Sequence, residues 1–496
     1  MPWNGGEFLM NYDLQNIAFC QDFIINIESF GGLLFERGGT PAWELDVHHA
    51  LFLRALQLTG IGQSALSVTH ELLENKDFYP AINVLSSLGA VCQKNKNCHQ
   101  TGNMDLNEAT IWIAKELSVA RSRSCLKAPT SLTIYPEMRC QQDCAFCFLS
   151  SSVKKMNANR NFEYWTNLIR EAKGMGVSSI SVLGGEPTLY PYLTDIIKVA
   201  QEENINIGIT SNGLCVADDL IRIVHGHPHS LFCFSLESLN PEIHHRYTGV
   251  DNDKVLNTIR CFHEAGIPFN VNTVGMGQSL DELKSIVDFC VCHGAIVWFL
   301  NLYYWQKASP KEFPGLYWYA RTDKALRQYI DRNHRGRIRY QMFGCQLYWT
   351  YDQSRLRRGS KLTNYNHMIS GCAAGINQLE ILPDGTALPC IQMDAKAFDC
   401  GNVFDKGLEI IWNDSNVLNK LRANKSPANS YCAACDWYPS CKGGCKARRE
   451  YSKRKYDIDI DPRCPRLSLQ ELPMLPNEER TIGEEMPLLR EFYHDT

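Results

Sequence analysis

The feature that most constrains the fold is a repeat of strand and helix signals in the middle of the chain. From about residue 130, short apolar runs rich in β-branched residues alternate with stretches of helical periodicity. Six such units in succession predict an α/β fold, with a parallel sheet and helices on its outside. Six units are too few for a closed eight-stranded barrel. The expected strands are 131–135, 179–183, 205–210, 231–236, 269–274 and 296–303, and the expected helices are 159–174, 191–203, 217–225, 253–265, 280–293 and 312–334.

Three cysteines, Cys140, Cys144 and Cys147, follow the first expected strand with the spacing C-x3-C-x2-C. Cubane iron–sulfur clusters take four ligands, so three thiolates leave one iron with an open position. An open position on a metal is a place for chemistry. A fragment of a zinc site, or three free buried thiols, is the alternative interpretation.

Polar and glycine-rich runs follow the next three expected strands. Because functional residues gather at the carboxyl ends of parallel strands, we expect these runs to surround the cysteine loop. The runs are Gly184-Gly185-Glu186-Pro187, Thr210-Ser211-Asn212-Gly213 and Ser235-Leu236-Glu237-Ser238.

The cysteine loop, with Phe146 before its last cysteine, and the Gly-Gly-Glu-Pro run resemble the signatures of the radical S-adenosylmethionine (SAM) superfamily. The resemblance implies a partial (β/α)6 barrel and a [4Fe-4S] cluster whose open iron chelates the methionine moiety of SAM. One electron then cleaves SAM to a 5′-deoxyadenosyl radical. The chain departs from the family after the fourth strand, where the family has Ser-(Leu/Ile)-Asp-Gly. The implied cofactor contacts are Phe146, Gly184, Gly185, Glu186, Pro187, Ser211, Asn212, Ser235 and Glu237.

A second cysteine array lies in the carboxyl third and resembles the SPASM extension of peptide-modifying radical SAM enzymes. Its seven cysteines are Cys372, Cys390, Cys432, Cys435, Cys441, Cys445 and Cys464. The resemblance implies two auxiliary [4Fe-4S] clusters, and therefore three clusters in all. It assigns Cys372, Cys390 and Cys445 to the first auxiliary cluster, and Cys432, Cys435, Cys441 and Cys464 to the second.

Two complete auxiliary clusters need eight thiolates, and the motif provides seven. Cys345 is the candidate for the eighth, and an open iron on the first auxiliary cluster is the alternative. Zinc is the competing metal, since paired C-x2-C elements also build zinc ribbons. The basic residues between 442 and 455 form either a solvated helix face or a patch that offsets cluster charge or guides an acidic peptide.

The amino-terminal residues have the pattern of a small winged-helix-like unit. Expected strands at 23–27, 33–36 and 43–45 precede expected helices at 47–57, 63–74 and 80–89. The run resembles PqqD-like precursor recognition domains, which bind the leader of a ribosomally made peptide as an added strand. Ten acids against four bases in residues 1–95 argue against DNA as the ligand.

Composition places the chain among cytoplasmic globular proteins. The net charge of −4 gives no overall nucleic-acid surface, and no apolar run is long enough to span a membrane. The chain has 21 cysteines and shows no signal peptide, which favours metal binding over disulfides. The expected domains are 1–95 (leader recognition), 96–127 (helical linker), 128–340 (radical SAM barrel), 341–470 (SPASM) and 471–496 (acidic tail).

These features together predict a radical SAM/SPASM maturase of a ribosomally synthesised peptide. Its expected partners are that precursor peptide and an electron donor such as flavodoxin or ferredoxin, with no nucleic acid and no membrane. An intramolecular C–C or C–X cross-link (cyclophane or thioether) is the expected product. Epimerisation, with Cys345 as a hydrogen donor, and backbone excision are alternatives, and a zinc-bearing regulatory protein is the hypothesis from another class.

Overall fold

The computed structural model falls into two compact units, the first ending at Thr130 and the second beginning at Ser131. Each is considered by itself. None of the described helices is long and apolar enough to cross a membrane. The structure describes residues 14–20, 23–36, 42–74, 85–86, 90–93, 102–123, 125–149, 151–158, 161–225, 230–303, 314, 316–343, 371–423, 430–435, 438–457, 459, 461 and 464.

The first unit is built on an antiparallel sheet whose three strands pair in sequence order. Apolar side chains of this sheet and of the helices α1, α2 and α4 form one core, because each element has one apolar face to bury. The expected strands and first two helices of this region match the structure, whereas most of the expected helix 80–89 lies outside the described residues. The elements are β2 (Phe23–Glu28), β3 (Gly31–Glu36), β4 (Ala42–Asp46), α1 (Val47–Thr59), α2 (Gly62–Leu73) and α4 (Leu106–Ser122), and the short pair β1 (Ile17–Phe19) and β5 (Val91–Gln93).

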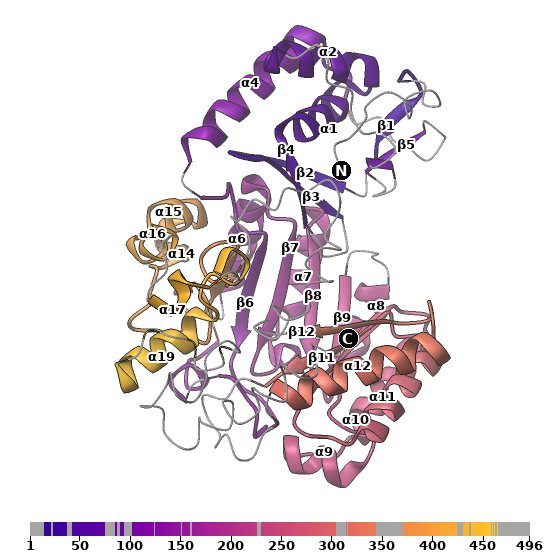
Figure 1. Cartoon of the computed structure of the whole chain (residues 1–496). Coiled ribbons are helices and arrows are strands. Elements are labelled where there is room, and N and C mark those ends of the chain that lie inside the picture. Colours follow the sequence, from indigo (N-terminus) through magenta and orange to yellow (C-terminus); the bar gives the residue numbers. More distant parts are fainter. Residues whose placement is uncertain are drawn as a thin grey trace. The chain divides into compact units, whose positions relative to one another are not determined.

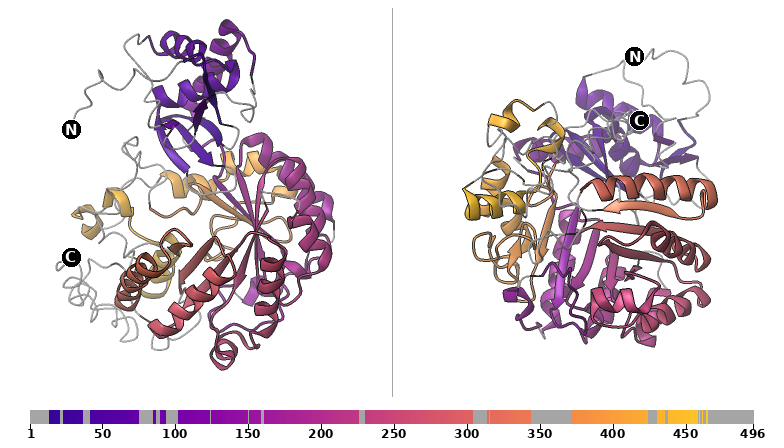
Figure 2. Two further views of the ribbon diagram at one scale, coloured as in Figure 1. Left: turned by 90° about the vertical axis from the view of Figure 1, so that its right-hand side faces the viewer. Right: turned by 60° about the horizontal axis from the view of Figure 1, so that its bottom comes forward.

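The second unit contains a nine-stranded sheet in the order β12-β11-β10-β9-β8-β7-β6-β13-β14. All neighbours are parallel except β13 and β14. Helices cover the outer side of this curved sheet (Figure 1, Figure 2). The strands are β6 (Ser131–Glu137), β7 (Ser179–Gly184), β8 (Asn206–Ser211), β9 (Ser230–Ser235), β10 (Phe269–Gly275), β11 (Val297–Leu302), β12 (Arg339–Phe343), β13 (Gln378–Ile381) and β14 (Ala387–Leu388).

The α/β class predicted from the sequence, with an open barrel of parallel strands, is confirmed. The connecting helices are amphipathic, and several begin at a side-chain cap, as α6 does at Asn161 and α11 at Ser279. The helices are α5 (Ser151–Lys154), α6 (Phe162–Met175), the 3-10 turn η1 (Pro187–Leu189), α7 (Leu193–Glu202), α8 (Asp218–His225), α9 (Pro241–Thr248), α10 (Asp253–Glu264), α11 (Leu280–Cys292) and α12 (Leu316–Asn333).

The sheet extends beyond the six expected strands at both ends. β12 follows α12 and, among the described strands, pairs only with β11, which suits its mixture of charged and apolar residues. β13 joins the other side of the sheet by pairing with β6, with Ile381 opposite Ile134. β6, the first strand of this sheet along the chain, therefore lies between β7 and β13, and β13 comes more than 200 residues later in the sequence.

The first two helices after β14, α14 and α15, pack against α6 of the barrel. Phe404 stacks on Tyr164, with ring centroids 4.8 Å apart, and meets the edge of the buried Trp165. The carboxylate of Glu171 accepts the backbone N–H of Glu409 at 3.0 Å, which satisfies one free donor at the start of α15. The helices are α14 (Val403–Lys406), α15 (Leu408–Asp414), α16 (Asn416–Ala423), α17 (Ser430–Ala433), α18 (Tyr438–Cys441) and α19 (Lys446–Tyr456).

A buried ion pair fixes α19 to the chain that follows it. Arg448 donates two hydrogen bonds of 2.8 Å to Asp461, and both side chains are almost fully buried. Asp461 also accepts the backbone N–H of Cys445 at 2.7 Å. Removing one partner of a buried pair leaves an uncompensated charge, which makes this contact more consequential than a surface pair.

We expect Arg448→Met to lower the free energy of unfolding by about 3–5 kcal/mol, because Asp461 would remain buried without its cation. Urea unfolding followed by circular dichroism, at equal cluster loading, measures the change. Arg454→Met is the matched control on the same helix, since Arg454 forms an exposed pair with Asp394 and should cost about 1 kcal/mol or less. Equal losses in the two variants would contradict the prediction.

Candidate functional site

The cysteine loop begins after β6, and helix α9 holds it in place. The N–H of Asp143 donates to the carbonyl of Thr248 at 3.2 Å, and that of Ala145 donates to Tyr247 at 2.9 Å. These carbonyls belong to the last turn of α9, where no further helical N–H remains to bind them. The loop therefore takes its shape from a helix that follows β9, three strands away from β6 in the sheet.

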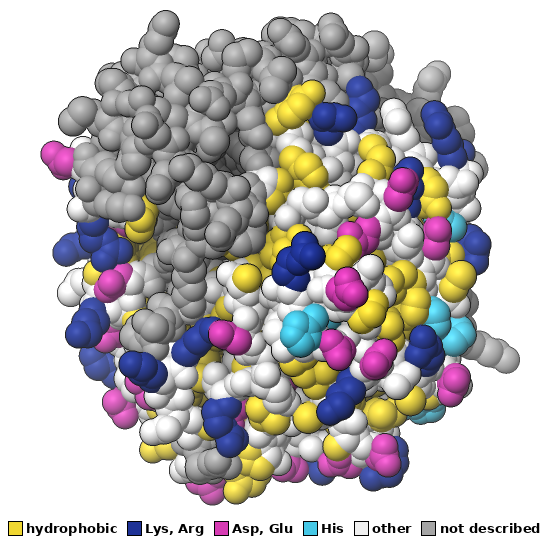
Figure 3. Space-filling view, turned by 90° about the horizontal axis from the view of Figure 1, so that it is seen from below, with side chains coloured by type: hydrophobic (Ala, Val, Ile, Leu, Met, Phe, Trp, Pro, Cys, Tyr) yellow, Lys and Arg dark blue, Asp and Glu magenta, His cyan; other side chains and the backbone are white. Residues whose placement is uncertain are grey.

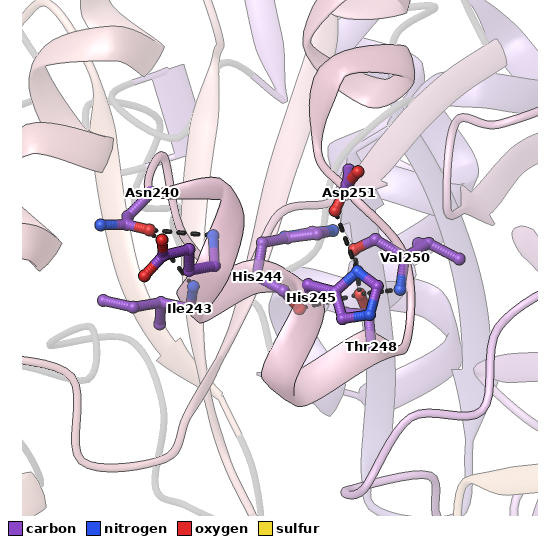
Figure 4. Close-up of polar contacts among 8 residues, drawn as sticks. Asn240, Ile243, His244, His245, Thr248, Val250 and Asp251 are labelled. Atoms are coloured by element: carbon purple, nitrogen blue, oxygen red, sulfur yellow. Dashed lines mark hydrogen bonds and ion pairs between the residues drawn. The ribbon is translucent and has the colours of Figure 1, made fainter.

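Helix α9 was not expected from the sequence, and its ends explain why it forms. The side chain of Asn240 caps the N–H groups of Glu242 and Ile243, and Gly249 ends the helix in a left-handed conformation (Figure 4). Thr248 donates its hydroxyl to the carbonyl of His244 at 2.9 Å. The Asn-Pro start and the Gly end are the sequence signals that identify this helix.

The two glycines at the end of β7, Gly184 and Gly185, let the chain there lie directly against the base of the cysteine loop. A Cβ on Gly185 would be 2.2 Å from the carbonyl oxygen of Met138, and one on Gly184 would be 2.1 Å from that of Glu137. The backbones instead bond, with Gly185 N–H donating to Glu137 at 2.9 Å and Glu186 N–H donating to Arg139 at 2.8 Å. The glycines therefore permit a close contact between two backbones.

The carboxylate of Glu186 joins the tips of β7 and β8. It accepts from the backbone and hydroxyl of Thr188 at 3.0 and 2.6 Å, from the hydroxyl of Ser211 at 2.8 Å and from the N–H of Asn212 at 2.8 Å. The side chain is buried, and burial raises its pKa against the effect of these donors. Three of the donors reach one oxygen, so the other keeps capacity for a ligand's ammonium.

Asn212 links this network to the first cysteine of the loop. Its side-chain nitrogen lies 3.8 Å from the sulfur of Cys140 and donates to Gln141 at 3.2 Å. Gln141 also donates to the exposed Cys215 at 3.2 Å. The tip of β8 thus adjoins the loop, as the sequence predicts for carboxyl ends of parallel strands.

The tip of β9 contributes a buried acid to the same face of the sheet. One oxygen of Glu237 accepts the N–H of Val274 at 2.7 Å, and the other has no hydrogen-bond partner among the described residues. Burial raises the pKa of Glu237 to about 8. Ser238, which stands where the family has glycine, donates its hydroxyl to Glu282.

His244 lies beside Glu237 within the same buried region. Its Nδ1 accepts the backbone N–H of Glu237 at 3.3 Å, and burial lowers its pKa to about 4, so the ring is neutral near pH 7. The sequence gives His244 no motif of its own. Helix α9 carries both this ring and the carbonyls that accept hydrogen bonds from the cysteine loop.

The three loop cysteines suit a thiolate-bound cluster chemically. Burial raises the pKa of Cys140 and of Cys144, and the negative charges of neighbouring thiolates and of Glu186 and Glu237 add to this effect. Thiolates in such a place need a bound metal to offset their charge. Cys147 packs against the apolar cluster formed around Tyr135, which shields the loop from solvent on that side.

Cys372, Cys390 and Cys445 come together from three separate segments. The sulfurs of Cys372 and Cys445 are within hydrogen-bonding distance, and Cys390 interacts electrostatically with Cys445. All three contact a small apolar cluster that contains Ala374 and Met393. Such a shell excludes water from a cluster and suits iron–sulfur ligation.

Glu380 of β13 adjoins this first auxiliary set. Its carboxylate lies within hydrogen-bonding distance of Cys390 and accepts the phenol of Tyr135, a β6 residue, at 2.5 Å. Burial raises the pKa of Glu380 to about 7. A chain of polar contacts therefore runs from β6 of the barrel to a cysteine of the carboxyl-terminal region.

The second set is anchored by the turn between Cys441 and Cys445. Cys441 interacts with Cys432, and burial raises the pKa of Cys441 to about 11. Cys435 donates its N–H to Cys432, and the N–H of Cys464 donates to Asp461 at 2.9 Å. The Arg448–Asp461 pair thus holds the segment of Cys464 beside the turn.

The remaining predicted site residues are placed as follows. Phe146 is half-buried within the cysteine loop, Ser235 is half-buried at the end of β9, and Pro187 is buried at the start of η1. Cys345 lies outside the described residues. Within the described ranges, no three His, Cys, Asp or Glu side chains are grouped to hold a single metal ion.

Comparison with known proteins identifies two domains in the second unit. The radical SAM superfamily matches residues 135–290, and the SPASM iron–sulfur cluster-binding domain matches residues 372–436. An AdoMet-dependent heme synthase of Methanosarcina barkeri is 20% identical over 66% of this chain and 93% of its own. The mycofactocin maturase MftC of Mycolicibacterium smegmatis is 23% identical over 68% of this chain and 83% of its own.

Among solved structures, SuiB of Streptococcus suis superposes with a TM-score of 0.73 at 25% identity, over 88% of this chain and 97% of its own. SuiB has also been solved with S-adenosylmethionine and with its precursor peptide SuiA. The matched domains, their order and the shared fold agree with the cysteine arrays and the sheet. The second unit therefore has a radical SAM fold, in which the partial barrel is followed by a match to the SPASM iron–sulfur cluster-binding domain.

Proposed function

We propose that this protein modifies a ribosomally synthesised precursor peptide, whose leader is bound by a PqqD-like domain within the first unit. The supporting observation is the extent of the likeness to SuiB, which was solved with a precursor peptide. That likeness covers 88% of the chain, whereas the part from Ser131 onward makes up only about three quarters. It therefore extends into the first unit.

The first unit has the architecture that strand addition requires. Its sheet has the order β2-β3-β4, so β2 and β4 each have one neighbour within that sheet. An extended leader can add to such an edge through main-chain hydrogen bonds. The AdoMet-dependent heme synthase of Methanosarcina barkeri has no peptide in its name, and its likeness covers 66% of this chain.

The chemistry that we propose is distributed over the two cysteine regions. Bound to Cys140, Cys144 and Cys147, a [4Fe-4S] cluster would supply a 5′-deoxyadenosyl radical from SAM. Glu186 would take the ammonium of SAM, and Asn212 would position it beside Cys140. The second oxygen of Glu237 would accept a hydrogen bond from a hydroxyl of the ribose.

An intramolecular C–C or C–X cross-link, a cyclophane or a thioether, is the product that the two auxiliary cysteine sets favour. Such a bond removes two hydrogen atoms from the peptide, and additional clusters supply a destination for the second electron. Epimerisation and backbone excision are the alternatives by the same radical. Three [4Fe-4S] clusters, a flavodoxin or ferredoxin as donor and a cytoplasmic setting complete the proposal.

Co-expression with a candidate precursor, taken from a short open reading frame next to the gene, tests the function directly. We expect mass spectrometry to show a loss of about 2 Da, because a cross-link removes two hydrogens. An unchanged mass with altered stereochemistry would indicate epimerisation, and a larger loss would indicate excision. A peptide that stays unmodified while the enzyme still cleaves SAM would contradict the proposed peptide modification.

We expect Cys140→Ala to abolish SAM cleavage and to lower the iron content by about four atoms per chain, because a two-cysteine loop cannot hold the cluster. Iron and sulfide analysis and the release of 5′-deoxyadenosine measure both effects. Cys215→Ala is the control, since this thiol contacts the same loop through Gln141 but lies outside the motif. A Cys140→Ala enzyme that still cleaves SAM would refute the assignment.

Glu186→Gln should weaken SAM binding about tenfold or more. The amide removes the negative charge that would bind the ammonium of SAM, and it replaces one hydrogen-bond-accepting oxygen with a donor. Calorimetric titration of the reconstituted enzyme with SAM gives the dissociation constant. Glu202→Gln, an exposed acid on the next helix, should leave it unchanged. Equal affinities for SAM in the wild type and Glu186→Gln would rule out this role.

A further inference from the structure

Lys446 occupies a special position among the basic residues of α19. It directly follows Cys445, and its ammonium donates to the carbonyl of Ala374 at 3.3 Å and to that of Leu421 at 3.4 Å. Ala374 belongs to the apolar cluster that Cys372, Cys390 and Cys445 also contact. The ammonium and the three sulfurs therefore share one small region of the fold.

The three arginines of α19 have acidic partners. Arg448 pairs with Asp461, Arg449 with Asp459 and Arg454 with Asp394. In the described part of the chain, no carboxylate forms an ion pair with Lys446, which is partly buried and bonds only carbonyl oxygens. A cation withdrawn from water needs an anion to offset its desolvation. Cys372, as a thiolate, would supply a negative charge that attracts this ammonium.

A second cation faces the same turn. Arg422 donates to the carbonyl of Gly375 at 2.8 Å and stacks on Trp412, with 4.1 Å between its guanidinium carbon and the ring centre. Two positive groups thus converge on residues 372–375. Glu380, the acid near Cys390, is held by Tyr135 and does not pair with Lys446.

We propose that Lys446 is the counter-charge of the first auxiliary cluster and raises its reduction potential. A cluster bound by thiolates carries net negative charge, and reduction adds one more, so a fixed cation nearby favours the reduced state. The helix start at Cys445 adds a partial positive charge of the same sense. This inference rests on the proposed cluster at Cys372, Cys390 and Cys445, but not on the identity of the peptide.

The test is a redox titration monitored by electron paramagnetic resonance, without SAM or peptide. It uses the full chain with Cys140, Cys144 and Cys147 changed to Ala, so that only auxiliary clusters contribute. In this background the signal that disappears on Cys372→Ala identifies the first cluster. Lys446→Met should move the midpoint potential of that signal to a more negative value and leave the other auxiliary signal unmoved.

Two further variants separate charge from structure. Lys446→Arg keeps the charge and should stay close to the wild-type potential, and so should Lys453→Met, which removes an exposed charge from the same helix. If Lys446→Met folds but loses about four iron atoms per chain, rescue of the iron by Arg supports the proposal. An unshifted potential in fully loaded Lys446→Met, or iron loss that Arg does not rescue, overturns it.

Iron analysis of the unmodified enzyme keeps this test distinct from the proposed function. About twelve iron atoms per chain are expected for three clusters, whereas about four would mean that the enzyme holds no auxiliary clusters. With twelve irons present, a null result for Lys446 leaves peptide modification unaffected.

Discussion

The architecture of the site depends on one close approach between two backbones. Gly184 and Gly185 bring the end of β7 against residues 137–139, where any Cβ would overlap a carbonyl oxygen. This contact fixes where the cysteine loop leaves β6 and where Glu186 enters the space between β7 and β8. Because Glu186 then binds the tip of β8, three successive strand ends are positioned by one backbone contact.

The carboxyl-terminal region is continuous with the barrel. β13 pairs with β6, so the hairpin between Cys372 and Cys390 extends the barrel's own sheet. Phe404 and the contact of Glu171 with Glu409 hold α14 and α15 to α6, the second helix after the cysteine loop. The segments that carry the loop and first auxiliary cysteines therefore rest on neighbouring parts of one framework.

Local signals predicted the sheet, the loop cysteines and the seven-cysteine array, because spacing and periodicity lie within short stretches of sequence. The sequence did not predict α9, whose eight residues are mostly polar and whose ends alone indicate a helix. The pairing of β13 with β6 was also missed, since pairing between distant strands leaves no local pattern. The hydrogen bonds of Glu186 with the tip of β8 were missed for the same reason, because their donors, Ser211 and Asn212, come from another strand.

The parallel pairing of β6 with β13 has a consequence for the distance between the two cysteine sets. Tyr135 and Glu380 lie on adjacent strands, one leading into the loop cysteines and the other into Cys390. A strand register changes only in whole residues, and a single step would reverse every side chain of β13 between the two faces. The register of β6 and β13 therefore sets the distance between these two cysteine sets. Substitutions on the surface that leave this register unchanged also leave that distance unchanged.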